Sequence, residues 1–290
     1  MKTAGIDIGG TNLRCAIFDE NHDIIDKLKI DNDRQLSPQD NLARLAEFIK
    51  AAGQECRGIG IGCPGPLDIR GGRILTPPNL PGWHGFEIVR YFEQATGLKT
   101  VLNNDANVAG LAEARLGAGN GYESVFYITV STGVGGAYVY RGEVVNGANS
   151  TAAEIFNLIV CDNAYTRSGM NPGALELQCA GPGLARQAAE IYHEPMTAET
   201  LFARYNGGDT LAAQVVERAA DMLARGMANI ACVVDPDIFI LGGSVALRNP
   251  GFVELACSRA RKYLIHPDAL RVEMARFTDD AGLVGASLLL

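Results

Sequence analysis

Cysteine occurs in this sequence without any spacing that would give it a structural role. The seven cysteines are odd in number and form no CxxC or CxC pair. Neither a disulfide framework nor a cysteine-rich zinc site is therefore predicted, and a reducing compartment suits the unpaired thiols best. The four histidines also show no mutual spacing, which argues against a histidine metal cluster and a Ser-His-Asp triad.

Long apolar runs and clusters of basic charge are missing as well. The longest apolar run, at 281–290, has about half the length of a membrane span. The N-terminus MKTAGIDIGG lacks the apolar stretch of a signal peptide. The 25 lysines and arginines are scattered singly among 33 acidic residues, for a net charge of −8. We therefore expect a cytoplasmic protein that binds neither nucleic acid nor a membrane surface.

Apolar residues are plentiful, at 47% of 290 residues, which is enough for about two globular domains. They alternate with period two in the segment 4–17, on both sides of a glycine turn at 9–12. The segment 124–140 repeats this pattern of strand, glycine turn and strand around a turn at 131–136. Two copies of one unit predict two similar α/β domains that face one another, with the glycine turns meeting in the cleft between them.

The domain limits follow from the connections. The longest helix is predicted at 210–234, with Asp209 as its N-cap, and leads through a strand to a third glycine turn, Gly242-Gly243-Ser244. Because no linker rich in serine or proline separates the halves, a boundary within 107–123 is predicted to be a hinge. We expect an N-terminal domain at 1–115, with a C-terminal helix at 279–290 packed back onto it, and a second domain at 116–278.

The glycine pairs at strand ends suit phosphate binding, because backbone N–H groups can approach an anion where no Cβ intervenes. Taken singly, Gly9-Gly10 is more simply explained as a tight hairpin, and the same holds for Gly135-Gly136. Three such turns, two of them with a threonine hydroxyl, indicate a nucleotide-binding cleft. Asp7 precedes the first turn, where its carboxylate suits Mg²⁺ held through water. The alternative is that Asp7 only caps the turn.

Two other phosphate-binding motifs are excluded. The segment 60–65, Gly-Ile-Gly-Cys-Pro-Gly, matches the dinucleotide-binding pattern GxGxxG. That fingerprint needs glycines that open a helix, whereas Pro66 and the segment 68–72 predict loop and turn. No GxxxxGK[ST] is present, so a P-loop is excluded too.

One carboxylate is placed where a general base would be useful. Asp105, in the segment Asn103-Asn104-Asp105-Ala106-Asn107, follows a predicted strand and opens a predicted helix. Phosphoryl transfer to an alcohol needs one carboxylate that orients the hydroxyl and accepts its proton. A helix cap explains the same residues equally well, so both interpretations stay open at this point.

Five motifs, taken together, resemble the ROK family of sugar kinases and sugar-responsive repressors. They are Asp7-Ile8-Gly9-Gly10-Thr11, Asn104-Asp105, Thr132-Gly133-Val134-Gly135-Gly136, Gly242-Gly243 and Asp280-Ala281-Gly282-Leu283-Val284-Gly285-Ala286. Their order and spacing match the family over nearly the whole chain. The resemblance implies two actin/hexokinase-like (ribonuclease H-like) α/β domains around a central cleft, in agreement with the internal repeat.

The resemblance also implies an activity: transfer of the γ-phosphoryl group of ATP to a sugar hydroxyl, usually that on carbon 6, with Asp105 as general base. Around ATP and Mg²⁺ it places Asp7, Gly9, Gly10, Thr11, Asn12, Thr132, Gly133, Gly135, Gly136 and Gly243. Around the sugar it places Gly65, Asn79, Asn104, Asp105, Glu154, Asn157 and Glu176. On the residues alone, Asn79, Glu154 and Glu176 indicate only polar surface. A homodimer is implied as well.

The chain departs from the family at the zinc loop. Many members carry Glu-x-Gly-His and then a cysteine-rich loop. This chain instead reads Glu154-Ile155-Phe156-Asn157, and Cys161 is the one cysteine between Asn157 and Glu176. One thiolate cannot build a four-ligand site, so no zinc is predicted. Asn157 replaces a family histidine that contacts the sugar, which leaves glucose, N-acetylmannosamine and a β-glucoside open as substrates.

Two further classes compete with a kinase. Repressors of the family carry a DNA-binding domain before the first glycine motif, whereas Asp7 is already the seventh residue here. A sugar-binding protein without catalysis is the other alternative, and the presence of both Asp7 and Asp105 argues against it. We therefore expect a sugar 6-kinase.

Overall fold

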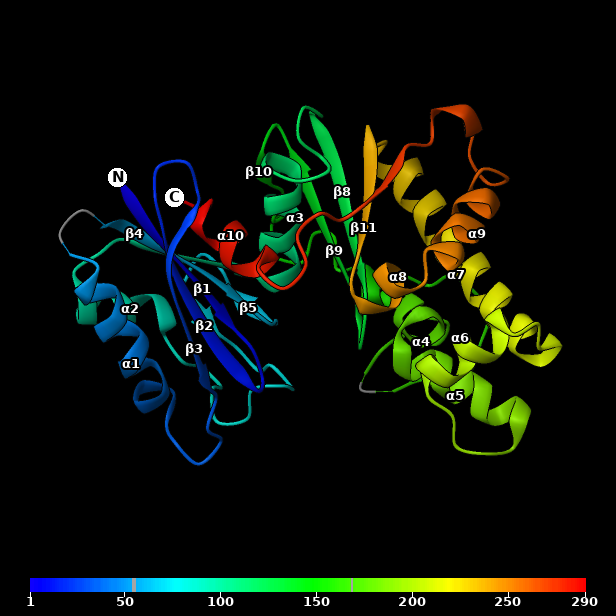
Figure 1. Cartoon of the computed structure of the whole chain (residues 1–290), viewed down its shortest axis with the longest axis horizontal. Helices are drawn as coiled ribbons and strands as arrows, with labels where there is room; N and C mark the ends of the chain where they lie inside the picture. The colour runs from blue at the N-terminus through cyan, green and yellow to red at the C-terminus, as the bar shows by residue number, and fades with distance from the viewer. Residues whose placement is uncertain (54–55, 168) are drawn as a thin grey trace. The chain divides into compact units, whose positions relative to one another are not determined.

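The computed structural model describes residues 1–53, 56–167 and 169–290, which form two compact units (Figure 1). Unit 1 comprises residues 1–117, 142–152 and 277–290, and unit 2 comprises residues 118–141 and 153–276. The first passage between the units, after Gly117, falls within the stretch 107–123 expected to hold a hinge. The segment 142–152 belongs to unit 1, whereas the sequence-based prediction assigned it to the second domain. The chain thus passes from unit 1 to unit 2 twice, after residue 117 and again after residue 152.

The sheet of unit 1 has the strand order β3-β2-β1-β4-β7. Its first three strands are antiparallel, and β4 and β7 run parallel to β1. The period-two alternation explains the hairpin β1–β2, because Ala4, Ile6 and Ile8 are buried on one face. The strands are β1 (Lys2–Ile8), β2 (Asn12–Phe18), β3 (Ile24–Asp31), β4 (Cys56–Cys63) and β7 (Thr100–Asn104).

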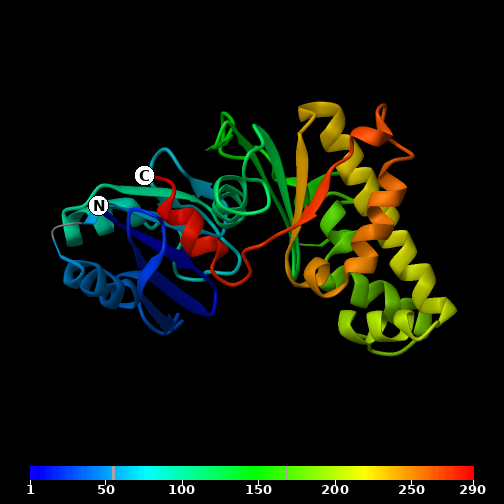
Figure 2. The same cartoon turned by 45° about the horizontal axis from the view of Figure 1, so that its top comes forward.

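Helices cover both faces of this sheet. On one face, α1 (Pro38–Ala51) and α2 (Ile88–Thr96) share a buried apolar cluster with the strands. On the other, α10 (Ala281–Ser287) packs on β1 and β4 and on α3 (Asp105–Arg115), as Figures 1 and 2 show. The approach of α10 depends on glycine, since a Cβ on Gly60 would lie 1.7 Å from the carbonyl oxygen of Ala286.

The GxGxxG segment lies at the end of β4 and leads into a short two-stranded sheet, β5 (Leu67–Asp68) and β6 (Arg73–Ile74). Residues 64–87, all of which the structure describes, contain no helix. The exclusion of a dinucleotide-binding fingerprint is therefore confirmed, because the glycines have no helix N-terminus behind them.

Unit 2 repeats the glycine-turn hairpin. Its strands have the order β9-β8-β11-β12, with β8 and β9 antiparallel and β11 and β12 parallel to β8. They are β8 (Ser124–Val130), β9 (Val134–Tyr140), β11 (Ile238–Gly242) and β12 (Val272–Met274); β10 (Glu143–Val144) follows β9 and lies in unit 1. The predicted α/β class, with one sheet in each of two domains, is confirmed.

The core of unit 2 forms against α7 (Thr210–Val234), the longest helix. Its N-cap is Asp209, which accepts hydrogen bonds from the amides of Leu211 and Ala212, as predicted. Figure 2 shows α7 beside α9 (Pro250–Ala260). The remaining elements are α4 (Leu175–Cys179), α5 (Gly181–Tyr192), α6 (Ala198–Asn206), α8 (Ser244–Arg248) and the 3₁₀ turns η1 (Ile155–Asn157) and η2 (Pro267–Ala269). Within the described residues, no helix is long and apolar enough to span a membrane.

Candidate functional site

The first glycine turn lies between β1 and β2 and is fixed by backbone and amide hydrogen bonds. Gly9 N donates to Asn12 O at 2.9 Å, and the side chain of Asn32 donates to Gly9 O at 2.9 Å. A Cβ on Gly10 would lie 2.9 Å from the carbonyl oxygen of Asn79. The turn therefore packs closely against the loop at 76–83, which contains Asn79 and three prolines. A predicted ATP-binding residue thus touches a predicted sugar-binding residue.

Three neighbouring strands of unit 1 bring Asp7 and the Asp105 segment to the same edge of the sheet. The register pairs Asp7 with Gly62, and Gly62 with Asn103. Because β1, β4 and β7 are parallel, their carboxyl ends share this edge, where ligands of α/β sheets commonly bind. Asp105 starts α3 directly after β7.

The structure is compatible with both interpretations of Asn104-Asp105, a helix cap and a general base. Asn104 is the N-cap of α3, and its side chain accepts a hydrogen bond from Ala106 N at 2.9 Å. Asp105 accepts from the same amide at 2.8 Å, and its side chain is open to solvent. Although the side chain keeps contact with solvent, the protein atoms around it desolvate it in part, and this raises the pKa of Asp105; the Ala106 amide opposes the shift, and the negative charge of Asp7 adds to it. Asp105 is thus accessible and favours holding a proton more than an ordinary aspartate does.

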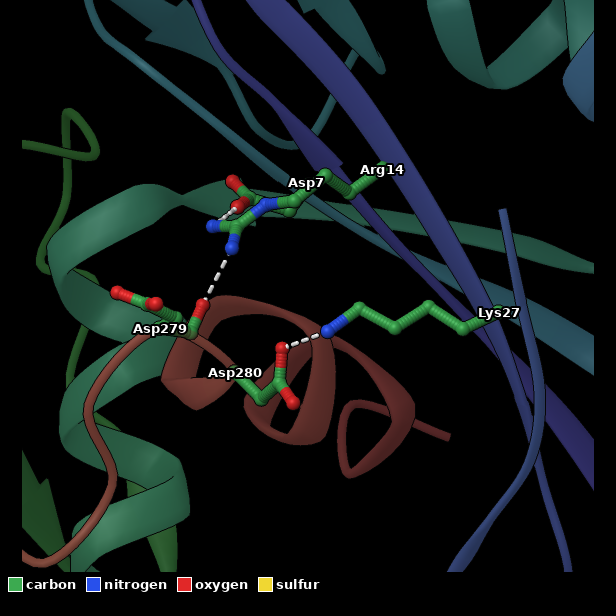
Figure 3. Close-up of polar contacts among 5 residues, drawn as sticks. All are labelled: Asp7, Arg14, Lys27, Asp279 and Asp280. Atoms are coloured by element: carbon green, nitrogen blue, oxygen red, sulfur yellow. Dashed lines mark hydrogen bonds and ion pairs between the residues drawn. The ribbon is translucent and has the colours of Figure 1, made fainter. Parts of the chain in front are cut away.

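Asp7 is held by residues outside the predicted site. Arg14, its partner on β2, forms an ion pair with Asp7 and also donates to the backbone of Asp279 (Figure 3). Gly282 of α10 approaches the carboxylate so closely that a Cβ there would lie 3.0 Å from Asp7 Cγ. Arg14 was not among the predicted site residues, although the predicted hairpin, with its tip at 9–12, places it opposite Asp7.

The second glycine turn, in unit 2, is shorter than predicted. Gly135 and Gly136 lie within β9 and pair with Thr129 and Ile128 of β8, so the turn spans only 131–133. The expectation of a turn over 131–136 was wrong, because strand pairing extends to Val134. Gly136 meets a packing requirement, since a Cβ there would lie 2.7 Å from Ala153 O.

Glu176 contacts this second turn. Its Oε2 accepts a hydrogen bond from Val134 N at 2.9 Å, and a Cβ on Gly133 would lie 2.8 Å from the same oxygen. Desolvation raises the pKa of Glu176, while the Val134 amide and Arg167 oppose that shift. A residue predicted to bind sugar therefore also shapes a turn predicted to bind phosphate, beside the exposed side chain of Thr132.

The third turn adjoins the second. Gly243 has a φ of 84°, and a Cβ there would lie 2.4 Å from Val130 O, so only glycine fits without strain. The hydroxyl groups of Ser131 and Ser244 are 2.9 Å apart. A pocket of about 280 Å³ lies next to Ser244, and no sequence pattern predicted it. Its lining consists of Ala198, Glu199, Phe202, Ala203, Asn206, Ser244, Val245, Arg248 and Asn249.

The remaining predicted sugar-binding residues are spread over both units. Asn157 ends η1, and its side-chain oxygen accepts a hydrogen bond from Asn171 N at 2.6 Å. Glu154 immediately precedes η1 and is exposed. Gly65 lies in unit 1, in the loop after β4, joined to Pro66 by a cis peptide bond. Asp7, Asp105, Asn79 and the first turn are thus assembled in unit 1, and Glu176 and the other two turns in unit 2.

The donor set decides which metal the chain could hold. Among the described residues, no three His, Cys, Asp or Glu side chains gather as a metal site. Mg²⁺ that accompanies a nucleotide takes only one or two protein carboxylates, with phosphate oxygens and water completing its coordination. Asp7 fits this sparse requirement.

Comparison with known proteins supports one family. The family model of the ROK family matches residues 3–290. N-acetylmannosamine kinase from Shigella boydii serotype 18 is 35% identical over 297 residues, covering 100% of this chain and 98% of that protein. The ROK hexokinase structure from Thermus thermophilus is 36% identical, with a TM-score of 0.92, covering 99% of this chain and 97% of that one. The ROK family glucokinase from Streptomyces griseus, solved with glucose and AMPPNP, is 26% identical, with a TM-score of 0.79, covering 100% of this chain and 99% of that one. The resemblance found in the motifs is thus confirmed, and the protein belongs to the ROK family.

Proposed function

We propose that the protein is an ATP-dependent sugar kinase that transfers the γ-phosphoryl group of ATP to the 6-hydroxyl of a hexose or N-acetylhexosamine. The observation that carries this proposal is the position of Asp105: it is solvent-accessible, lies at the start of α3, and shares a sheet edge with Asp7. A carboxylate with a raised pKa is a better proton acceptor for a hydroxyl than an ordinary aspartate.

Asp105 acts as the general base in this proposal. It accepts the proton of the sugar hydroxyl as the oxygen attacks the γ-phosphorus and the bond to the β-phosphate oxygen breaks, which releases ADP. Asn104 caps α3 and so fixes the backbone from which Asp105 projects. Phosphoryl transfer otherwise depends mainly on positioning and on charge stabilisation.

ATP is assigned to the glycine turns. In unit 1 the amides and the exposed hydroxyl of residues 9–12 suit phosphate oxygens, and in unit 2 residues 131–133 and Gly243 do the same. The pocket beside Ser244 and Arg248 suits the nucleoside, since it adjoins the third turn. Mg²⁺, when bound with ATP, would neutralise phosphate charge, and Asp7 would hold it through water. The AMPPNP bound by the Streptomyces griseus glucokinase is in accord with ATP as the donor.

The sugar is proposed to be N-acetylmannosamine or glucose. The Shigella boydii relative is an N-acetylmannosamine kinase, and the Streptomyces griseus structure holds glucose. Amide and carboxylate groups of Asn79, Glu154 and Glu176 suit several adjacent hydroxyls. The side-chain oxygen of Asn157 accepts a hydrogen bond from Asn171 N. The side-chain NH₂ group of Asn157 could therefore donate to a ligand.

ADP release with Mg·ATP, measured over glucose, N-acetylmannosamine, N-acetylglucosamine, mannose, fructose, allose and a β-glucoside, tests the proposal. We expect one sugar, N-acetylmannosamine or glucose, to stand well above the others. A β-glucoside in first place would identify a β-glucoside kinase instead. Absence of turnover, with sugars still raising the melting temperature, would identify a sugar sensor and contradict the proposal. A homodimer and a cytoplasmic location remain predictions, the first testable by light scattering.

A further inference from the structure

Arg14 binds two parts of unit 1 with one guanidinium group. Its Nη2 forms an ion pair with Oδ2 of Asp7, its register partner on β1. Its Nη1 donates a hydrogen bond to the backbone carbonyl of Asp279, just ahead of α10. Figure 3 shows the guanidinium between the carboxylate and the start of that helix. The planar fork of arginine suits such a bridge, which the single ammonium of lysine cannot reproduce.

The Asp7 side chain is enclosed as well as paired. It is 14% exposed, and the Arg14 side chain is 25% exposed. Gly282 closes over the carboxylate, where a Cβ would come within 3.0 Å of Asp7 Cγ. Burying a carboxylate to this extent costs free energy unless a positively charged group pairs with it. Arg14 provides the positive charge. Gly282, which has no Cβ, allows α10 to lie this close to the carboxylate.

A second ion pair already attaches α10 to the sheet. Lys27 of β3 pairs with Asp280, the N-cap residue of α10 (Figure 3). The close packing of α10 on Gly5 and Gly60 adds to that attachment. Because α10 has these other contacts, the main contribution of Arg14 is its ion pair with Asp7.

We propose that Arg14 is a positioning residue for phosphoryl transfer: it holds Oδ2 of Asp7 and so presents the other carboxylate oxygen to the hydrated Mg²⁺ that arrives with ATP. The chain's own residues thereby preset the direction of the carboxylate before any ligand binds. Groups that orient a metal-binding side chain contribute about 10- to 100-fold to metal affinity or activity. Because this role builds on the proposed kinase function, its test must distinguish the failure of either.

The experiment compares Arg14→Gln, Arg14→Lys and the matched control Lys27→Gln. Mn²⁺ binding to each protein, saturated with AMPPNP, is followed by the electron paramagnetic resonance signal of free Mn²⁺. Steady-state kcat and KM are measured with the preferred sugar. We expect Arg14→Gln to weaken Mn²⁺ binding and to lower kcat by about 10- to 100-fold, with the KM of the sugar little changed. Arg14→Lys should recover part of the loss, and Lys27→Gln should match the wild type.

The proposal is overturned if folded Arg14→Gln binds Mn²⁺ as well as the wild type does, or if Lys27→Gln loses as much as Arg14→Gln. Should Arg14→Gln fail to fold, Arg14→Lys decides, because lysine keeps the charge without the fork; wild-type Mn²⁺ affinity in that variant would overturn the proposal. Failure of the kinase function itself would look different. The wild-type protein would then bind no Mn²⁺·AMPPNP or would phosphorylate no sugar.

Discussion

The carboxylate of Glu176 accepts a hydrogen bond from the backbone N–H of Val134 at 2.9 Å, although 42 residues separate the two in the chain. Val134 follows the glycine turn of unit 2, and Glu176 is in the first turn of α4. One side chain proposed to bind sugar therefore also fixes the backbone of a turn proposed to bind phosphate. Substitutions of Glu176 should affect both substrates, to different degrees.

Glu176→Ala should raise the KM of ATP by about 10- to 100-fold, because a hydrogen bond to a charged group contributes about 1.5–3 kcal/mol, and should raise the KM of the sugar as well. Glu176→Gln keeps an oxygen that can accept from Val134 N, so it should raise mainly the KM of the sugar. Steady-state kinetics with each substrate varied in turn measures both effects. Equal KM values for ATP in the wild type and in Glu176→Ala would contradict the link between this side chain and the turn.

Asp105→Asn should lower kcat by about 10²- to 10⁴-fold, the usual contribution of a positioned general base. The amide cannot accept the proton of the hydroxyl, but it occupies the same space and can still accept a hydrogen bond from Ala106 N. Sugar affinity, measured by calorimetry, should therefore stay within several-fold of the wild type. Unchanged turnover would remove Asp105 as the base.

The pH dependence of the reaction should reflect the raised pKa of Asp105. Desolvation, and then the negative charge of Asp7, favour the protonated form, and a protonated carboxyl cannot act as a base. The value of kcat/KM should therefore fall as the pH drops through a pKa above about 3.9, the ordinary value for aspartate. The measurement is kcat/KM against pH, with thermal unfolding at each pH as a control for folding. A profile that stays flat down to about pH 4 would count against this assignment.

Gly243→Ala should destabilise the protein by about 1–3 kcal/mol, since the residue has a positive φ and its Cβ would collide with Val130 O. It should also raise the KM of ATP, because the third turn would shift. Gly251→Ala is the matched control: Gly251 lies in the first turn of α9, and nothing stands within 4 Å of a Cβ there. Chemical denaturation of both variants gives the comparison. Equal stability would show that the turn relaxes at no cost.

Ala203→Phe should fill the pocket beside Ser244 and raise the KM of ATP by about tenfold or more, equal to about 1.4 kcal/mol of binding free energy. Ala203 is exposed on α6, so the fold has room for the larger ring. The KM of the sugar should not change. Ala51→Phe, at the exposed end of α1, is the control for added apolar surface. A wild-type KM for ATP in Ala203→Phe would assign the pocket no part in nucleotide binding.

Local patterns determined most of the elements of this protein. Alternation around Gly9-Gly10 predicted the hairpin β1–β2, because strand periodicity needs only neighbouring residues. The apolar stripe and Asp209 predicted the whole of α7, including its first residue, since a cap acts within one turn. The repeated hairpins predicted two α/β units, and the order of the glycine motifs predicted the ROK family.

Contacts between distant segments required the tertiary structure. The pairing of Gly135 with Thr129 shortened the second turn, the return of 142–152 to unit 1 moved a domain limit, and the Val134–Glu176 hydrogen bond joined two predicted subsites. The ion pair of Asp7 with Arg14 could have been predicted from the hairpin register, but the hydrogen bond from Arg14 to the backbone carbonyl of Asp279 could not. Periodicity and capping depend on a few adjacent residues, whereas these contacts depend on how separated segments pack, which no local pattern encodes.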